Sequence, residues 1–455
     1  MTLAGHLPPE HPLSPRTALR RLSPAVRPLA PCDPEPLWEA DTRLLPRALR
    51  RYRRAVREFA RRELRPRALE LDREPHGPAE REVLLAAARA GLLTDLLPWP
   101  LGSVPWSRMR HPLALVQSLK MEELCAACGG LGLLIGAHGL GSAPLLLSGD
   151  PGAIRRFLLP AYRRTRAGHP SLLAFAITEP GAGSDAEESV GAAGARPGTR
   201  VRRVAGGFRL SGRKVFISGG DLAEAVTVFA ALEDGGMESW TCFLVERSRS
   251  GFSVARRELK MGQRASGAAE LVFDDVFLPD DQVVGGLGRG WALNRATLTL
   301  SRIPVGAIAL GIARGAAEAA VEFARRARLG GRPLVSYQDV QIEIARMLTE
   351  LEAMRALVWR SARTWRPRQA RASMTKVFCS DAAVRVCERA MALMSDHGLL
   401  QAQRAEKAFR DARLTQIYEG TNQVNLLAVI EDHLDELEPL PDGAAGEGGP
   451  WPTGS

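Results

Sequence analysis

The chain has 455 residues, of which 45% are hydrophobic and 25% are charged. This length allows two or three packed domains with ample core, and the composition is ordinary for a soluble globular protein. The longest apolar runs are interrupted by glycine or charge well before the ~18 residues that a membrane span requires. No membrane span is therefore expected.

The formal net charge is +10, and only five of the 61 basic residues are lysines. This skew toward arginine indicates a coding bias rather than a designed polycation. The net charge would still attract polyanionic ligands at long range. The basic runs, however, are dispersed over helical faces such as residues 47–67, where arginines usually form a solvated surface. Nucleic acid is therefore not expected as the partner.

Residues 1–42 form a Pro-rich, basic N-terminal extension without the compact apolar core of a secretory signal. An organellar transit peptide remains an alternative, although the acidic residues Glu10, Asp33 and Glu35 argue against one. We expect a cytoplasmic protein, or a protein of the mitochondrial matrix if the source is eukaryotic.

Residues 43–170 are predicted to form a helical domain, because apolar residues recur there at spacings of three and four. This region also contains Cys125 and Cys128, which form the C-x-x-C pair of the chain. The pair lies in an apolar, helix-like stretch without a second Cys or His pair nearby. We therefore expect buried thiols in a reducing compartment, and no metal site.

Residues 171–285 are predicted to form a β domain, because short runs rich in Val, Phe and Ile alternate with Gly, Asp and Ser turns. Long helical patterns return over residues 286–435 and predict a helical bundle. The tail, residues 436–455, is rich in Gly and Pro and is expected to be disordered. The order helical, β, helical indicates an α+β fold.

One loop carries a dinucleotide-like pattern, Gly181-x-Gly183-x-x-Ala186, directly after an apolar strand. It satisfies the loose Rossmann fingerprint, in which glycines let the backbone approach a pyrophosphate at a helix N-terminus. The required long helix does not follow, because residues 187–203 have no apolar stripe and lead into residues 206–220, which are typical of a hairpin. A plain surface turn is the alternative.

Five separate motifs occur in one order along the chain, and together they resemble the acyl-CoA dehydrogenase flavoproteins. They are FAITEPGAGSD (175–185), GRKVFISGG (212–220), MGQRASGAAELVFDDVFLP (261–279), LSRIPVGAIALGIA (300–313) and FRDARLTQIYEGTNQVN (409–425). The similarity runs from about residue 45 to residue 433. It implies an all-α N-terminal domain, a middle β-sheet or barrel domain and a C-terminal four-helix bundle, with FAD held without a Rossmann fold.

The resemblance also implies an activity in fatty-acid metabolism. A glutamate removes the α-proton of an acyl-CoA thioester while the β-hydrogen leaves as hydride to the flavin, which gives the trans-2-enoyl thioester. An ordinary glutamate, with a pKa of ~4.3, is too weak a base for such a carbon acid. Burial would raise that pKa, and the family uses the backbone N–H of the glutamate and a flavin hydroxyl to stabilise the enolate oxygen.

The glutamate at the family's position is Glu419. Gly420 would let the chain run close to flavin and thioester. From the residues alone, this stretch is also a helix-stop signal with a glycine cap. Some family members carry the base immediately before the arginine of the first long C-terminal helix. That position is Ser301, before Arg302, and cannot serve.

The remaining roles carry over from the family position by position. Phe216 stands where the family often has Trp, and Ser218 where a Thr hydroxyl approaches the flavin; Phe216 could instead be ordinary strand core. Arg302 resembles an arginine at the acyl-CoA site, although helix arginines are common in this chain. The implied cofactor contacts are Phe175, Ile177, Thr178, Gly183, Ser184, Phe216, Ile217, Ser218, Thr421 and Gln423, and the implied substrate contacts are Ser184, Arg302, Tyr418 and Gly420.

Two family elements that reach the FAD of a neighbouring subunit are altered. Ala327 and Gly330 replace the Arg and Phe of the first, and Ala392 with Ser395 and Asp396 replace the Gln and Gly pair of the second. The family implies a homo-oligomer, a dimer or a tetramer, with an electron-transfer flavoprotein as acceptor. The altered elements favour two alternatives, a hetero-oligomer with a related chain or a flavin-poor subunit. A nucleic-acid-associated member is a third alternative. The sequence does not define the length of the acyl chain, nor whether the thioester is carried by CoA or by an acyl-carrier protein.

Overall fold

The computed structural model describes residues 10–26, 35–75, 77–187 and 189–434. The predicted disordered tail, residues 436–455, lies outside this part of the chain. The N-terminal region is helical, as its apolar spacing predicts. Its helices are α1 (Pro15–Arg20), α2 (Leu37–Arg43), α3 (Arg47–Phe59), α4 (Ala68–Arg73), α5 (Pro78–Arg89), α6 (Trp106–Met109), α7 (Leu113–Ala127), α8 (Gly129–Leu147), α9 (Pro151–Ala153) and α10 (Leu159–Arg166).

The middle region is an eight-stranded mixed sheet in the order β6-β7-β3-β2-β4-β5-β8, with β1 paired in parallel to β4. Its inward faces form one apolar core, and a second core lies where α8 and α10 pack on the sheet. The strands are β1 (Leu173–Ala176), β2 (Arg200–Val204), β3 (Gly207–Ser218), β4 (Ala225–Leu232), β5 (Thr241–Glu246), β6 (Phe252–Arg257), β7 (Ala268–Pro279) and β8 (Val283–Val284).

The hairpin predicted over residues 206–220 is wrong, because this segment is the single long strand β3. The Ser211-Gly212 pair, which is typical of a turn, lies instead at an irregularity in the pairing of β3 with β7. Gly212 has φ 146°, and a Cβ there would lie 2.6 Å from the Cα of Thr199. The partner of β3 in the real hairpin is β2, which the sequence analysis missed.

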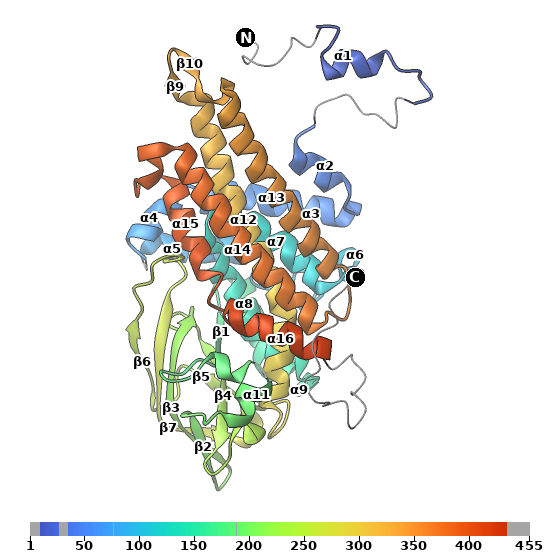
Figure 1. The fold of residues 1–455 in the computed structure, drawn as a ribbon. Coiled ribbons are helices and arrows are strands. Elements are labelled where there is room, and N and C mark those ends of the chain that lie inside the picture. The colour runs from blue at the N-terminus through green and yellow to red at the C-terminus, as the bar shows by residue number, and fades with distance from the viewer. Residues whose placement is uncertain (1–9, 27–34, 76, 188, 435–455) are drawn as a thin grey trace, which may run out of the picture.

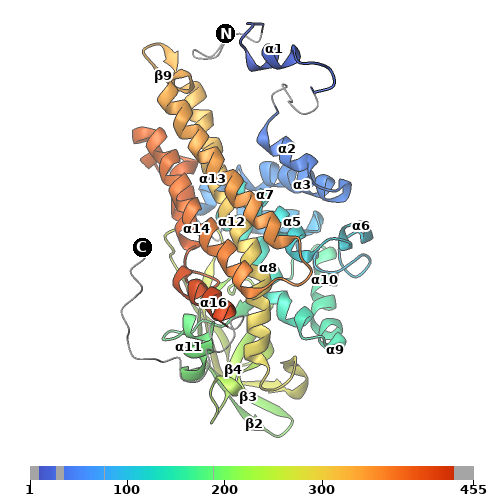
Figure 2. The same cartoon turned by 45° about the vertical axis from the view of Figure 1, so that its right-hand side comes forward.

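The C-terminal region consists of long helices that run away from the sheet (Figure 1). The longest, α12, packs along α7 of the N-terminal region as well as along α14, so both helical regions share one apolar core. A short hairpin caps the far end of α12 in both views (Figure 2). The elements are α12 (Gly290–Arg326), β9 (Arg328–Leu329), β10 (Arg332–Pro333), α13 (Gln338–Ala362), α14 (Gln369–Leu393), α15 (Arg404–Leu414) and α16 (Asn422–Leu434).

Within the part of the chain that the structure describes, two helices, α8 and α12, contain 18-residue stretches that are apolar enough to cross a membrane by length and composition alone. The share of these stretches buried inside the protein is 61% for α8 and 72% for α12. Their apolar side chains contribute to the shared core, which explains why the composition of each is so hydrophobic.

The cysteines that the structure describes are free and buried, Cys125 and Cys128 among them. Burial raises the pKa of both of these thiols, so they are poor nucleophiles and poor metal ligands. Among the described residues, no group of three or more His, Cys, Asp or Glu side chains is arranged to hold a metal ion.

Candidate functional site

Glu419 lies in the turn between α15 and α16, and its backbone is left-handed. Its φ is 56°, and Gly420 follows with φ 82°. A left-handed conformation costs a glutamate free energy, so the surroundings must hold the turn in place. Asn425, in the first turns of α16, does so by donating its side-chain amide to the carbonyl oxygens of Glu419 and Gly420, at 3.2 and 2.9 Å. These two hydrogen bonds therefore hold the backbone of the turn that carries Glu419.

Two consecutive residues of α12 contact Glu419. The Ser301 hydroxyl donates to Glu419 Oε2 at 2.6 Å, and Arg302 Nε donates to the Glu419 carbonyl oxygen at 3.1 Å. Ser301 occupies the position that carries the base in some relatives of the predicted family. In this chain Ser301 instead donates a hydrogen bond to the carboxylate of Glu419, which is the predicted base.

The Arg302 guanidinium is buried and engaged with protein groups. Besides the Glu419 carbonyl, it donates to Ser373 Oγ at 3.1 Å and to Glu187 Oε2 at 2.9 Å. A Cβ on Gly420 would overlap the Glu187 carboxylate and lie 3.1 Å from Arg302. The close approach of Glu187 and Arg302, together with the positive φ, therefore explains why this position requires glycine.

Lys376, on α14, completes the cluster by donating to the Gly420 carbonyl oxygen at 2.7 Å and to Asn422 Oδ1 at 2.8 Å. Burial lowers the pKa of Lys376 to about 7 and raises that of Glu187 to about 7. Burial also raises the pKa of Glu419, against the opposing effects of the Ser301 hydrogen bond, Arg302 and Lys376. Two carboxylates and two cations therefore share one buried region.

The loop after β1 joins this cluster to the sheet. Asn294 of α12 donates to the Ala186 carbonyl oxygen at 3.2 Å, next to Glu187. Gly183 and Ser184 lie half-buried in the same loop, and the helix that follows, α11 (Ser189–Gly194), has six residues. A helix this short, together with the mixed sheet, excludes the Rossmann interpretation of the loop.

Phe216 is exposed on the sheet, although the other large apolar side chains of its strand are buried. Its side chain is 60% exposed, and its φ is 58°, at a register shift between Lys214 and Ile217. The alternative that Phe216 is ordinary strand core is therefore wrong. The bulge turns Phe216 outward while the Ile217 side chain stays in the core, and Ser218 is half-buried.

The end of β1 lies beside this bulge, because the Val215 N–H donates to the Thr178 carbonyl oxygen at 2.9 Å. Phe175 and Ile177 pack against the sheet core, with the Phe175 ring 5.3 Å from that of Phe229. The structure thus places the predicted strand and loop residues side by side.

The predicted residues next to Glu419 differ in whether protein groups already contact their side chains. The Tyr418 hydroxyl accepts a hydrogen bond from the Gln263 side chain at 3.2 Å. The Thr421 hydroxyl accepts from the Val424 N–H at 3.4 Å, whereas Gln423 is exposed on α16. The sequence analysis missed Glu187, Lys376 and Asn425 as members of this cluster.

The two altered elements lie together at the far end of the bundle. Ala327 ends α12, and Gly330 follows in the β9–β10 hairpin. Ser395 and Asp396 lie beside them, because the His397 ring packs 5.2 Å from that of Phe323 on α12. At about 1.5 Å per residue, the end of α12 is roughly 37 Å from Arg302. These elements therefore cannot reach the Glu419 region of the same chain.

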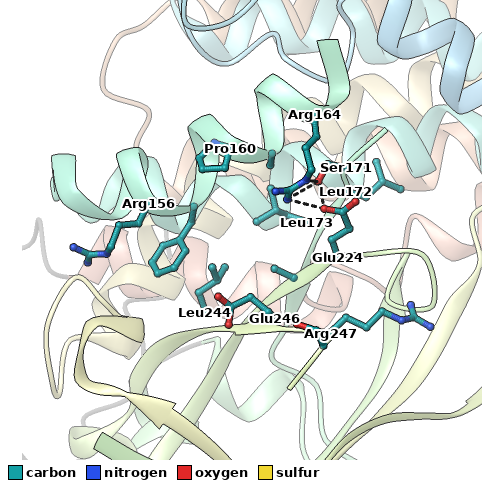
Figure 3. A pocket seen from close by; sticks show the side chains of 14 residues that line it. Arg156, Pro160, Arg164, Ser171, Leu172, Leu173, Glu224, Leu244, Glu246 and Arg247 are labelled. Atoms are coloured by element: carbon teal, nitrogen blue, oxygen red, sulfur yellow. Dashed lines mark hydrogen bonds and ion pairs between the residues drawn. The ribbon is translucent and has the colours of Figure 1, made fainter. Parts of the chain in front are cut away.

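A separate cavity of about 500 Å³ lies between α10 and the sheet (Figure 3). An ion pair of 2.6 Å between Arg164 and Glu224 lies across it, and Phe157 and Leu244 supply apolar walls. None of the predicted site residues lines this cavity.

Comparison with known proteins gives matches over nearly the whole described chain. Models of the N-terminal, middle and C-terminal domains of acyl-CoA dehydrogenase match residues 47–164, 174–276 and 288–434. Cyclohex-1-ene-1-carbonyl-CoA dehydrogenase of Syntrophus aciditrophicus is 34% identical over 376 residues, which is 81% of this chain and 86% of that protein.

Solved structures agree with the sequence matches. Butyryl-CoA dehydrogenase from Megasphaera elsdenii superposes with a TM-score of 0.77 at 30% identity, covering 86% of this chain and 99% of that one. A glutaryl-CoA dehydrogenase from Mycobacterium smegmatis in complex with FADH2 gives a TM-score of 0.75 at 25% identity, covering 88% and 97%.

The fold and the matches define the protein as an oxidoreductase. The chain belongs to the acyl-CoA dehydrogenase family. It is an enzyme that dehydrogenates an acyl-CoA to the enoyl-CoA, in a family that works with a flavin cofactor. The resemblance, the fold class and the activity predicted from the sequence are thus confirmed. The relatives differ in the acyl group that their names state, so membership leaves the substrate open.

Proposed function

We propose that Glu419 is the base that removes the α-proton of the acyl thioester. The observation that carries this proposal is the half-buried Glu419 carboxylate, held by Ser301 at 2.6 Å in a turn that Asn425 and Arg302 fix through its carbonyl groups. Burial raises the pKa of Glu419, which moves the carboxylate toward the basicity that a carbon acid requires. The Glu419 N–H would stabilise the enolate oxygen.

The flavin-side residues fit FAD. The aromatic ring of Phe216 lies outside the core, and its backbone has a strained, positive φ. An exposed ring of this kind is suited to cover one face of a planar isoalloxazine. Ser218, Thr178 and the Gly183-Ser184 loop would supply short polar contacts beside it. When bound, the flavin supplies the acceptor for the β-hydride.

The remaining assignments are part of the same proposal. The substrate is an acyl-CoA or acyl-carrier thioester, and the electrons pass to an electron-transfer flavoprotein or another acceptor. The enzyme acts as a homo-oligomer, a dimer or a tetramer, in the cytoplasm, or in the mitochondrial matrix of a eukaryote. Arg302, whose nitrogens donate to protein groups, serves the base rather than the acyl chain.

The test is the substitution Glu419→Gln, which keeps the shape of the side chain and removes the base. The flavin-loaded variant is expected to stay folded and yellow but to lose bleaching by saturated acyl-CoAs under anaerobic conditions. Glu350→Gln, on the far part of the bundle, serves as the control and should bleach like the wild type. Unchanged turnover in Glu419→Gln would exclude Glu419 as the base.

A second candidate, a subunit that borrows flavin contacts from a related chain, is favoured by Asp396. Its side chain is 86% exposed and negatively charged at the position where the family presents glycine to a neighbour's flavin. A carboxylate there repels a pyrophosphate. Measuring the flavin content and the mass in solution of the protein purified alone distinguishes the two candidate functions. A flavin-loaded homo-oligomer supports the first candidate, and colourless protein that does not take up FAD supports the second.

A further inference from the structure

Glu187 is a buried carboxylate next to the proposed base, and the mechanism above does not use it. It is 7% exposed, and its Oε2 accepts from Arg302 at 2.9 Å. Its Oε2 lies so close to Gly420 that a Cβ there would overlap it. Glu187 therefore packs directly on the residue that follows Glu419.

Arg302 creates an electrostatic difficulty for the base. Its guanidinium holds the Glu419 carbonyl and is 1% exposed, so its charge is poorly screened by water. A cation beside a carboxylate favours the ionised form, which makes that carboxylate a weaker base. The arginine that fixes the turn thus also works against proton abstraction.

We propose that Glu187 is a positioning residue for Glu419, which holds Arg302 against the Glu419 carbonyl oxygen and cancels the Arg302 charge, so that Glu419 stays basic enough to remove the α-proton. This inference rests on the proposed function. It assigns to the loop after β1 a role toward the base, in addition to its proposed contacts with the cofactor.

The charged groups that act on Glu187 come from three elements. They are Arg302 on α12, Glu419 in the turn and Lys376 on α14. Glu419 raises the affinity of Glu187 for protons. Because such an interaction is reciprocal, the two carboxyl groups are expected to titrate as a coupled pair rather than as independent groups. The acid side of the pH profile of kcat/KM should therefore be broader than that of a single carboxyl group.

Glu187→Gln tests the proposal, because the amide oxygen can still accept from Arg302 while the negative charge is lost. Because the pKa of Glu187 is raised to about 7, the substitution removes a charge only where Glu187 is ionised, so the upper part of the acid limb of kcat/KM, near pH 7, should move to lower pH and the limb should narrow to a single titration. A weaker base should also lower kcat on the plateau about threefold to tenfold, with KM little changed. Glu187→Asp, which keeps the charge, should retain the broad profile.

Glu431→Gln is the matched control. Glu431 forms an ion pair of 3.2 Å with Arg295 on the same helix α12 and accepts from Ser189, at the other end of the same loop. Loss of that carboxylate removes an anchor of the loop without changing the charge beside Glu419. Its pH profile should match that of the wild type. An acid limb of Glu187→Gln that is unshifted, or shifted no more than that of Glu431→Gln, would overturn the proposal.

Thermal unfolding gives a readout that does not depend on turnover. The pKa of Glu187 is raised to about 7, so its stabilising contribution is fully present below its unfolded pKa and is lost as the pH rises through about 7. The Tm of Glu187→Gln relative to wild type should therefore rise between pH 5 and pH 8, and a flat difference would contradict the assigned environment.

The two proposals can fail separately. Full activity of Glu419→Gln would refute the proposed function. An inactive Glu419→Gln together with an unshifted acid limb of Glu187→Gln would refute this inference alone.

Discussion

Lys214 and Glu179 form an ion pair of 2.9 Å at the start of the loop after β1. The Lys214 ammonium is fully buried and also donates to the Ile177 carbonyl oxygen at 2.8 Å. Glu179 in turn accepts from the N–H groups of Gly198 and Thr199. One buried pair therefore ties the end of β1 to β3, immediately before Phe216, and to the segment that enters β2.

Replacing Lys214 by Met should destabilise the protein by about 3–5 kcal/mol, because the Glu179 carboxylate would stay buried without its cation. The double variant Lys214→Met with Glu179→Gln should recover a large part of this loss, since both charges are then absent. Chemical denaturation of the two variants checks the expectation. A double variant no more stable than Lys214→Met would show that the pair acts through packing rather than charge.

Phe216 should reverse the usual order of Ala and Gly in a strand. At φ 58° a Cβ is unfavourable by roughly 1–2 kcal/mol, so Phe216→Gly should be more stable than Phe216→Ala by about 1 kcal/mol. Both variants should bind flavin more weakly than the wild type if the ring covers it. The free energy of unfolding and the flavin content of each variant are the measurements.

Phe277 provides the comparison. It is an exposed aromatic residue on β7 of the same sheet and is not among the described residues with positive φ. Phe277→Gly should be less stable than Phe277→Ala, as in ordinary strands. The same order at both positions would mean that the strain at Phe216 does not matter for stability.

The parts of the candidate site that the family resemblance implies could be proposed from the sequence because each lies in a contiguous motif. Glu419 with its glycine, and the strand and loop residues from Phe175 to Ser184, belong to such motifs. Glu187 could not be predicted in this way, because its function depends on contact with Arg302, 115 positions away. No local pattern marks a loop carboxylate as buried.

Lysines offered a signal that the sequence analysis recorded but did not use. Where a coding bias favours arginine, a lysine that persists marks a place where a compact ammonium fits and a guanidinium does not. Four of the five lysines, Lys120, Lys214, Lys376 and Lys407, are buried, and Lys214 and Lys376 lie at the two halves of the site. The scarcity of lysine could therefore have identified Lys376 in advance.

His138 should make the protein sensitive to acid. Its Nδ1 accepts from the Leu173 N–H at 3.0 Å, so its Nε2 carries the proton and donates to the Leu93 carbonyl oxygen at 2.8 Å. Burial lowers the pKa of His138 to about 4. The neutral ring stabilises the fold above its unfolded pKa of ~6.5, and this contribution is lost as the pH falls toward 4, on the order of 3 kcal/mol in total.

Denaturation of the wild type and of His138→Gln between pH 7 and pH 4 measures this contribution. The variant should be less stable at pH 7, where it cannot reproduce both hydrogen bonds, and its stability should fall less on acidification. An equal acid sensitivity of His138→Gln and wild type would assign the effect to other groups.

The end of the N-terminal extension is part of the fold, which the composition of residues 1–42 did not predict. Asp41 of α2 forms a buried ion pair of 2.7 Å with Arg355 of α13, and Trp38 donates its indole N–H to Glu123 of α7 at 2.8 Å. Asp41→Ala should cost about 1–3 kcal/mol, because it removes a buried partner of a charged donor that keeps its contact with Glu122.

Glu39 on the same helix is the matched control, since its ion pair with Arg54 joins two partly exposed side chains. Glu39→Ala should change the free energy of unfolding by less than about 1 kcal/mol, as is usual for a surface pair. If both substitutions cost the same small amount, α2 contributes nothing specific to the bundle. A large loss confined to Asp41→Ala means that the helical core extends into the segment before residue 43, and that truncation there would expose the buried charges of Arg355 and Glu123.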